Sequence, residues 1–233
     1  MIVLERASFD GCHLRFSAKL VLSRARVLSA LLLIPAAFFT LSSVSSASPE
    51  PPLSNVQTLV DQATHILQIP GIPVEQRRAQ LRGLAEQHLD FPLMARSALG
   101  ARWQDLADSQ RRDYVQLFTA FIEDAYLSRI QGYLDLKFTF VGQTLSGTDH
   151  AQVATYVVQT NGETTKLNFE LELKDQEWRI YDVEINGVSM IGNYRIQFQR
   201  VINEKGFDAL MSQLDRKQKE LASLLGRPPE SKQ

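Results

Sequence analysis

Hydrophobic residues in the first half of the chain recur at the spacing of helices. The clearest helix begins at Ser109, and its apolar residues fall at i, i+3, i+4, i+7, i+8, i+11 and i+12: Tyr114, Leu117, Phe118, Phe121, Ile122, Ala125 and Tyr126. This spacing gives one broad apolar stripe and predicts a long amphipathic helix. Shorter helices are expected before 69–73, over 74–89, and from the candidate N-cap Asp90 to Gly100.

In the second half the hydrophobic period becomes two, which is typical of β-strands. Apolar and polar residues alternate over 134–140 and again over 167–173. Asn161-Gly162 predicts a type I′ hairpin turn between two strands, and 174–177 predicts a second tight turn. In the strand that follows, the apolar parity changes near Ile180, which predicts a β-bulge.

Four sequential strands joined by short turns form an antiparallel meander, which can bury one face and leave the other in water. The sequence therefore predicts an α+β domain, with helices packed on one face of a small four-stranded antiparallel sheet around an internal apolar cavity. The long aromatic helix is expected to lie on this sheet. Six phenylalanines are expected to point into one interior: Phe118, Phe121, Phe138, Phe140, Phe169 and Phe198.

The first 47 residues differ from the rest of the chain. A basic lead precedes the uncharged apolar run 27–41, and the small residues Ser45 and Ala47 follow it. This order predicts a secretory signal peptide. A membrane anchor is the alternative, but spanning a bilayer takes about 20 apolar residues and Pro35 interrupts this run.

These observations predict a domain organisation and a compartment. The expected segments are a signal peptide over 1–47, a flexible Pro/Ser tether over 48–54, a binding domain over 55–225 and a disordered tail over 226–233. Cys12 is the only cysteine and would be removed with the signal, so the mature chain would have no disulfide and no thiolate metal site. A secreted domain of this composition fits the periplasm.

The charge of the expected mature chain is slightly acidic. Removal of 1–47 leaves 20 basic and 24 acidic residues of the 25 and 26 in the whole chain. This balance disfavours nucleic acid and anionic membrane surfaces as main partners.

Catalytic motifs are incomplete. Ser189 resembles the nucleophile of G-x-S-x-G, but Gly192 lies one residue beyond the position of the second glycine in that motif. In addition, no histidine is placed to pair with Ser189. Ser189 is therefore expected to cap or turn a strand-to-helix junction. The histidines have no metal-ligand spacing, and no phosphate-binding loop occurs. An acid–base role for Asp182 or Tyr181, in an enzyme acting on a small apolar substrate, stays open as an alternative.

Two motifs carry a family resemblance. The segment WRIYDVEINGVSMIGNYRIQFQRVINEKGFDALMSQL (178–214) resembles the MlaC family, also called the Ttg2D or toluene-tolerance family of periplasmic phospholipid carriers. The matching positions are Trp178, Asp182, Gly187, Ser189, Asn193, Tyr194, Arg195, Phe198 and Gly206. DFPLMARSALGARW (90–103) matches a second family motif, and the likeness covers about 55–225.

The resemblance implies a carrier rather than an enzyme. It would move phospholipid between an outer-membrane lipoprotein complex and an inner-membrane ABC transporter that bears a substrate-binding domain. No cofactor is expected, because the bound phospholipid is the cargo. A related branch is linked with hopanoid producers, so a hopanoid or another lipid is an alternative cargo.

The expected cavity lies between the 114–126 helix and the sheet. Its candidate lining residues are Phe118, Phe121, Ile122, Leu136, Phe138, Val157, Leu167, Phe169 and Leu171. The junction that closes the cavity is assigned to Ser189, Asn193, Tyr194 and Arg195. Arg195 is expected to pair with a carboxylate or to bond the end of a helix or strand. A solid core without a cavity would instead indicate a pure interaction module.

Overall fold

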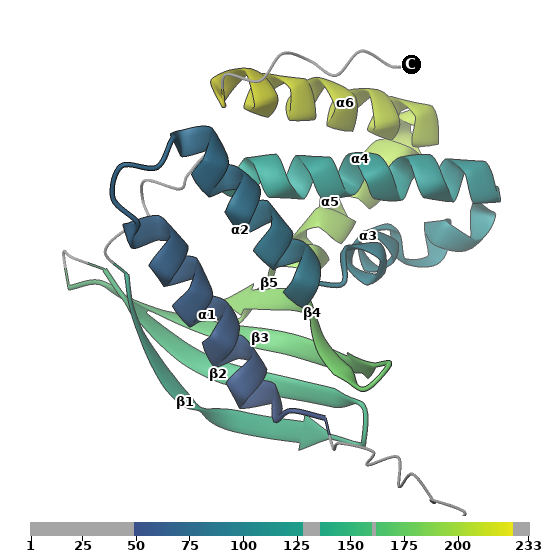
Figure 1. Cartoon of the computed structure of the whole chain (residues 1–233). Helices are drawn as coiled ribbons and strands as arrows, with labels where there is room; N and C mark the ends of the chain where they lie inside the picture. Colours follow the sequence, from purple (N-terminus) through teal and green to yellow (C-terminus); the bar gives the residue numbers. More distant parts are fainter. Residues whose placement is uncertain (1–48, 128–135, 160–161, 226–233) are drawn as a thin grey trace, which may run out of the picture. The chain divides into compact units, whose positions relative to one another are not determined.

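The computed structural model describes residues 49–127, 136–159 and 162–225, within a compact unit that spans Ser46–Gln233 (Figure 1). The described helices are α1 (Pro52–Gln68), α2 (Val74–His88), α3 (Phe91–Leu99), the 3-10 helix η1 (Gly100–Asp105), α4 (Asp108–Leu127), α5 (Met190–Lys205) and α6 (Phe207–Leu224). The strands are β1 (Lys137–Ser146), β2 (His150–Val158), β3 (Thr164–Lys174), β4 (Glu177–Ile185) and β5 (Val188–Ser189). The expected signal segment lies outside the described residues, and α1 begins at Pro52, inside the segment expected as a tether.

The helix boundaries follow the local signals in the sequence. The Asp90 carboxylate accepts a hydrogen bond from the backbone N–H of Leu93 at 2.8 Å, which confirms Asp90 as the N-cap of α3. Pro92 occupies the first turn of α3, where a missing N–H costs nothing. Gly100 ends the helix with φ +58°, a left-handed conformation that favours glycine.

The sheet is an antiparallel meander in the order β1-β2-β3-β4-β5. Asp175 and Gln176 join β3 to β4 with φ of 51° and 67°, as a tight hairpin turn requires. The predicted bulge is confirmed: Glu170 pairs with Asp182 and Leu171 with Ile180, which leaves Tyr181 as the extra residue. Asn161, in the other predicted turn, lies outside the described residues.

The expected number of strands was one too few. Asn186 and Gly187 both adopt positive φ, 51° and 81°, so the chain reverses immediately after β4. Val188 and Ser189 then pair with Ile185 and Glu184 as the short strand β5. The sequence showed a break at Asn-Gly, but a two-residue strand has no periodicity to detect.

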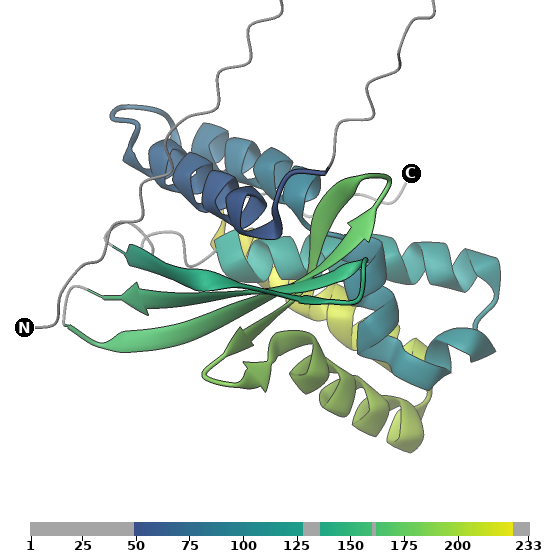
Figure 2. The same ribbon diagram turned by 90° about the horizontal axis from the view of Figure 1, so that it is seen from below.

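The sheet separates helices on its two sides (Figure 2). Alternation along the strands defines an apolar face, which includes Val153 of β2, Phe169 of β3 and Ile180 of β4. Helix α1 packs on this face through Val56 and Val60. Figure 2 shows α5 on the opposite side of the sheet.

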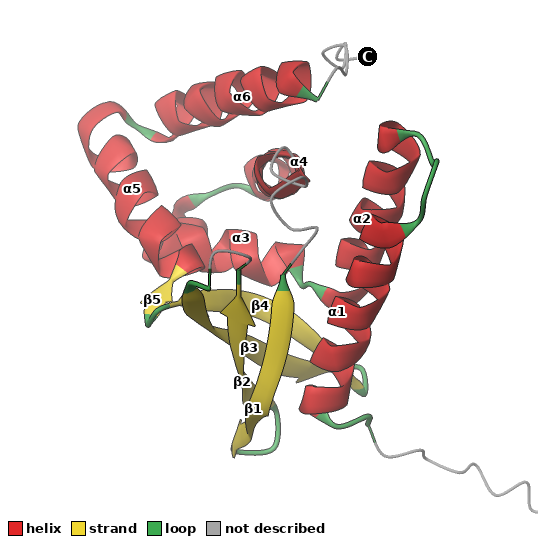
Figure 3. Ribbon diagram, turned by 90° about the vertical axis from the view of Figure 1, so that its left-hand side faces the viewer, coloured by secondary structure: helices red, strands yellow, loops and turns green. Residues whose placement is uncertain are grey.

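The expectation that the long helix α4 lies on the sheet is wrong. Its main packing partners are α6 and α3. Figure 3 shows α3 running between α4 and the sheet, and α3 also contacts β4. An amphipathic stripe predicts that a helix is buried, but it does not say against which element.

The six phenylalanines also do not share one interior. Phe118, Phe121 and Phe198 belong to a cluster formed by helices α3 to α6, here called the helix core. Phe138, Phe140 and Phe169 belong to a second cluster between α1 and the sheet, here called the sheet core. Leu89, after α2, packs against both clusters. The insertion of α3 between α4 and the sheet is the reason for the division.

Candidate functional site

The sheet core is more tightly closed at one end than at the other. Near the β3–β4 turn, Leu171 and Ile180 of the sheet core are 0% and 1% exposed. Towards the other end of the apolar face, Phe138 of β1 and Leu167 of β3 are half-buried, and Ile185 of β4 is 42% exposed. The apolar face of the sheet therefore extends beyond the part that is fully covered.

Thr155 interrupts this apolar face. It pairs with Phe140 on one side and Leu167 on the other, and it is 0% exposed. Its hydroxyl oxygen has no hydrogen-bond partner within the described residues. A buried hydroxyl without a partner costs stability, so this position is a weak point in an otherwise apolar surface.

The nine candidate lining residues fall into separate places. Phe118, Phe121 and Ile122 lie in the helix core. The sheet core contains or contacts Phe138, Leu167, Phe169 and Leu171. Val157 is buried beside Phe138 in the sheet, and half-exposed Leu136 immediately precedes β1.

The C-terminal part of α4 meets the first turns of α5. The rings of Phe121 and Tyr194 cross edge-to-face with centroids 5.6 Å apart, and the Tyr126 hydroxyl contacts the Met190 sulfur. Met190 follows the β5 hairpin, which starts from Ile185. The β4–β5–α5 junction thus joins the helix core to the less covered end of the sheet.

Asp182 and Ser189 hold this junction together. One Asp182 oxygen accepts the backbone N–H groups of Val183 and Ile191, at 2.8 and 3.0 Å, and the other accepts the Ser189 hydroxyl proton. The Ser189 oxygen in turn accepts the N–H of Gly192 at 2.7 Å, which makes it the N-cap of α5. Both side chains accept hydrogen bonds from backbone N–H groups in the first turn of α5, which would otherwise have no partner. Neither side chain is placed as a nucleophile or a free base.

The other junction residues act on the surface of α5. Arg195 donates from Nε to the carbonyl of Ser97 at 2.7 Å, near the C-terminal end of α3. Tyr194 packs its ring against Phe198 with centroids 5.6 Å apart. Asn193 is exposed.

A buried ionic cluster was missed by sequence reasoning. Asp124 of α4 is 0% exposed and accepts hydrogen bonds from Arg82 of α2 at 3.3 Å and from Gln218 of α6 at 3.0 Å. Arg82 also bonds Glu123 at 2.8 Å, and burial raises the pKa of the Glu123 carboxyl. The only sequence signal was a carboxylate beside the apolar stripe of α4, whereas both partners come from distant helices.

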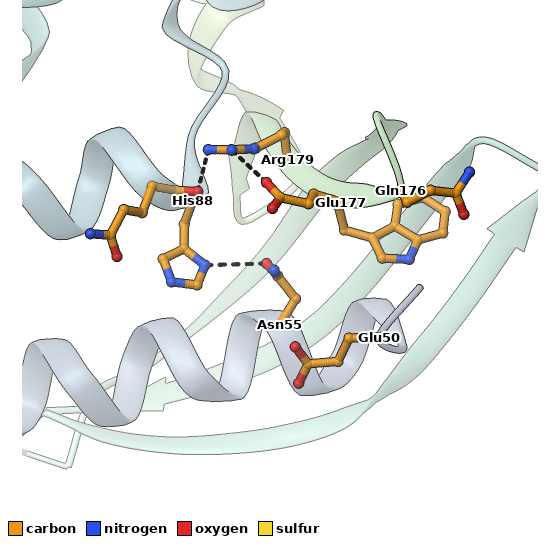
Figure 4. Close-up of a pocket in the computed structure, with 8 residues that line it drawn as sticks. Glu50, Asn55, His88, Gln176, Glu177 and Arg179 are labelled. Atoms are coloured by element: carbon orange, nitrogen blue, oxygen red, sulfur yellow. Dashed lines mark hydrogen bonds and ion pairs between the residues drawn. The ribbon is translucent and has the colours of Figure 1, made fainter. Parts of the chain in front are cut away.

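A polar pocket of about 340 Å³ lies between the start of α1, the end of α2 and the β3–β4 turn (Figure 4). Its lining includes Glu50, Asn55, His88, Glu177 and Arg179. Burial lowers the pKa of His88, which favours its neutral form. This pocket contains none of the candidate lining residues, and its charged walls do not suit hydrocarbon.

The described residues contain no cluster of three His, Cys, Asp or Glu side chains that could hold a metal ion. Among the described helices, none combines the length and apolar content that a membrane span needs.

The arrangement of elements matches a solved lipid-bound fold. The structure is similar to that of a phospholipid-binding protein from Ralstonia solanacearum in complex with a phospholipid, with a TM-score of 0.66 and 21% identity. The match covers 74% of this chain and 99% of that one. At this identity the likeness establishes the class of fold, the α+β fold of that phospholipid-binding protein.

The family follows from the sequence. The model of the MlaC protein family matches residues 57–216, and the chain belongs to this family. The intermembrane phospholipid transport system binding protein MlaC of Haemophilus influenzae is 23% identical over 120 residues. That alignment spans 50% of this chain and 56% of the relative, so the chain covers little more than half of that protein's length.

Proposed function

We propose that this protein is a periplasmic phospholipid carrier that shelters acyl chains against the apolar face of its sheet. The observation that carries the proposal is the graded burial of this face. Leu171 and Ile180 are sealed within the sheet core, whereas Leu167 and Ile185 of the same strands retain accessible apolar surface. Membership of the MlaC family and the fold shared with a phospholipid-bound protein support the same function.

The energetics explain why a carrier is needed. Two acyl chains have roughly 30 methylenes, and each costs about 0.8 kcal/mol to expose to water. A phospholipid would therefore cross an aqueous gap unassisted at a cost above about 20 kcal/mol. An apolar interior that nearly matches the bilayer removes this barrier while still allowing release.

We also propose a route for the phospholipid. The carrier would receive and deliver phospholipid at an outer-membrane lipoprotein complex and an inner-membrane ABC transporter with a substrate-binding domain. The pattern of the first 47 residues supports export to the periplasm. The sequence has no phosphate-binding loop for a nucleotide, so the energy would come from the transporter.

The geometry at Asp182 argues against this residue as the general base of the enzyme alternative. Both carboxylate oxygens are engaged by hydrogen-bond donors of β4 and of the β5–α5 junction. A general base needs a free oxygen that faces a substrate. This carboxylate instead stabilises the start of α5.

Native mass spectrometry of the purified protein, followed by organic extraction, tests the proposal. We expect co-purified phospholipid near one molecule per chain. Extracts that contain hopanoid instead would assign that cargo. Protein that stays free of lipid, even after incubation with phospholipid vesicles, would overturn the proposal.

Neighbouring residues on opposite faces of β3 provide a matched pair of variants. Leu167→Trp adds volume to the apolar face and should lower the lipid retained per chain. Lys166→Trp adds the same side chain to the other face, where Lys166 is exposed, and should leave retention unchanged. Equal retention in both variants would show that acyl chains do not contact this part of the sheet.

A further inference from the structure

The face of the sheet opposite the apolar one carries an unusual concentration of negative charge. Glu170 pairs directly with Asp182 across β3 and β4, Asn168 pairs with Glu184, and Glu172 follows Glu170 on the same face. We call the four carboxylates Glu170, Glu172, Asp182 and Glu184 the acidic surface. Burial raises the pKa of Tyr181, and these four carboxylates raise it further. The Tyr181 ring crosses that of His150, the partner of Glu172 in β2, with centroids 6.3 Å apart.

No cation of the described chain pairs with the acidic surface. The ion pairs among the described residues include none of its four carboxylates. Arg179, opposite Glu172 in the register, bonds Glu177 and the end of α2 instead. Lys174 is paired with Asp90 at 3.1 Å. Arg179 and Lys174 are thus directed elsewhere. Lys166 is exposed on the same face of β3 as Asn168, and within the described residues it forms no ion pair with the four carboxylates.

The hydrogen-bond donors that reach Glu170, Glu184 and Asp182 are all neutral. Gln152 donates to Glu170, and Asn168 donates to Glu184 at 3.0 Å. Asp182 caps α5. Carboxylates directly opposite each other in a sheet destabilise the fold, so the arrangement has a cost that no described ion pair offsets.

Asn168 gives an independent indication of a missing donor. It is 6% exposed, its amide head lies against Glu184, and its side-chain oxygen has no hydrogen-bond partner within the described residues. A buried acceptor of this kind normally has a donor. Accessible aromatic surface lies nearby on the same face, because Tyr156 is 41% exposed and Tyr181 is half-buried.

From this arrangement we infer that the acidic surface is a docking site for a protein partner that presents arginine or lysine side chains. Carboxylates accept charge-assisted hydrogen bonds from guanidinium and ammonium groups, and tyrosine rings add favourable contacts with the same cations. A divalent ion is the less suitable occupant, because no cluster of the described residues has the geometry of a metal site. An anionic lipid surface would be repelled.

The docking site lies on the opposite face of the sheet from the apolar interior, so the inference does not depend on the cargo. Electrostatic docking of this type accelerates association and is weakened by salt. It would allow a partner to bind without covering the apolar face of the sheet.

The test uses the purified protein and a short flexible peptide of alternating arginine and serine, with the glutamate version as its control. Chemical-shift mapping should locate the arginine peptide on 150–156, 168–172 and 181–184. The double variant Glu170→Gln/Glu184→Gln should bind roughly fivefold more weakly. The control Glu204→Gln/Glu220→Gln removes the same charge from exposed helical positions and should bind as the parent does.

Two results would overturn the inference. One is peptide binding that is spread over the whole acidic part of the molecule or is equal in the two double variants. The other is tight binding of Ca²⁺ or Mg²⁺ that displaces the peptide, which would make this a metal site. The lipid content of each variant is measured in parallel and should stay unchanged, so failure of the docking site is distinguishable from failure of the proposed carrier function.

Discussion

The Asp182 carboxylate of β4 accepts the backbone N–H of Ile191 at 3.0 Å, so a strand residue caps the first turn of helix α5. The same side chain also accepts the proton of Ser189, the N-cap residue of that helix. One carboxylate therefore fixes the angle at which α5 leaves the sheet. The hydrogen bonds of this junction account for the positions of Asp182 and Ser189 in the motif.

Replacement of Asp182 should weaken the whole domain. Asp182→Ala leaves the N–H of Ile191 and the Ser189 hydroxyl without their acceptor and should cost about 2 kcal/mol of unfolding free energy. Asp182→Asn keeps an acceptor but loses the charge at the helix N-terminus, and about 1 kcal/mol is expected. Urea unfolding followed by circular dichroism measures both. An unchanged midpoint for Asp182→Ala would contradict the capping role.

Loss of the Arg195 side chain should loosen the contact between α5 and α3. Arg195→Ala removes the bond to the Ser97 carbonyl and should cost about 1 kcal/mol. If the junction closes the lipid-binding interior, lipid retention should fall in the same variant. Arg200→Ala changes an exposed arginine of the same helix and serves as the control. Unchanged melting and retention in Arg195→Ala would show that this residue does not hold the junction.

The buried cluster on α4 should depend strongly on its arginine. Arg82→Met leaves the carboxylates of Asp124 and Glu123 in a buried environment without this cation, and we expect a loss of about 3 kcal/mol. Arg112→Met, on the exposed side of α4, should have little effect. The comparison is made by thermal unfolding. Equal melting temperatures would mean that water reaches the cluster and screens its charges.

Thr155 is a position where a small change should stabilise the protein. Thr155→Val replaces the buried hydroxyl, which has no partner among the described residues, with a methyl group of similar size. A gain of about 1 kcal/mol is expected, because the desolvation cost of the hydroxyl disappears. Differential scanning calorimetry of lipid-free protein measures it. A loss of stability would indicate that the hydroxyl has a partner in solution, such as a bound water.

The acidic surface predicts a pH dependence of stability. Burial raises the pKa of Glu170 above its ordinary value of 4.5, and the charges of Glu184 and Asp182 raise it further, whereas the Gln152 hydrogen bond opposes them. The folded state therefore holds this proton more tightly than the unfolded state. The contribution of Glu170 to the free energy of unfolding is most favourable below about pH 4.5. It is lost as the pH rises through the pKa of Glu170 in the folded state.

Glu170→Gln should consequently raise stability near neutral pH by about 0.5 kcal/mol, and the gain should vanish in acid. Melting temperatures of the variant and the parent, measured from acidic to neutral pH, provide the comparison. A gain that is the same at every pH would mean that the charge of Glu170 is not its cause.

Local features of this protein could be predicted from the sequence because each depends on residues that lie close together in the chain. Asp90 caps α3, Gly100 ends it, and the parity change near Ile180 marks the bulge at Tyr181. The alternation in β3 separates Leu167 and Phe169 from Asn168 and Glu170. These features defined an α+β domain with one apolar face of the sheet, and the motifs identified the family.

Tertiary structure alone decided which apolar surfaces meet. Helix α3 lies between α4 and the sheet, so Phe118 and Phe169 occupy different cores although both follow clear periodic patterns. The hydrogen-bond partners of Asp124 are Arg82 and Gln218, which are 42 and 94 positions away in the sequence. No local pattern encodes such separations. A periodic apolar stripe indicates that one face of a helix or strand is buried. Which element packs against that face depends on how all the helices and the sheet share the available apolar area.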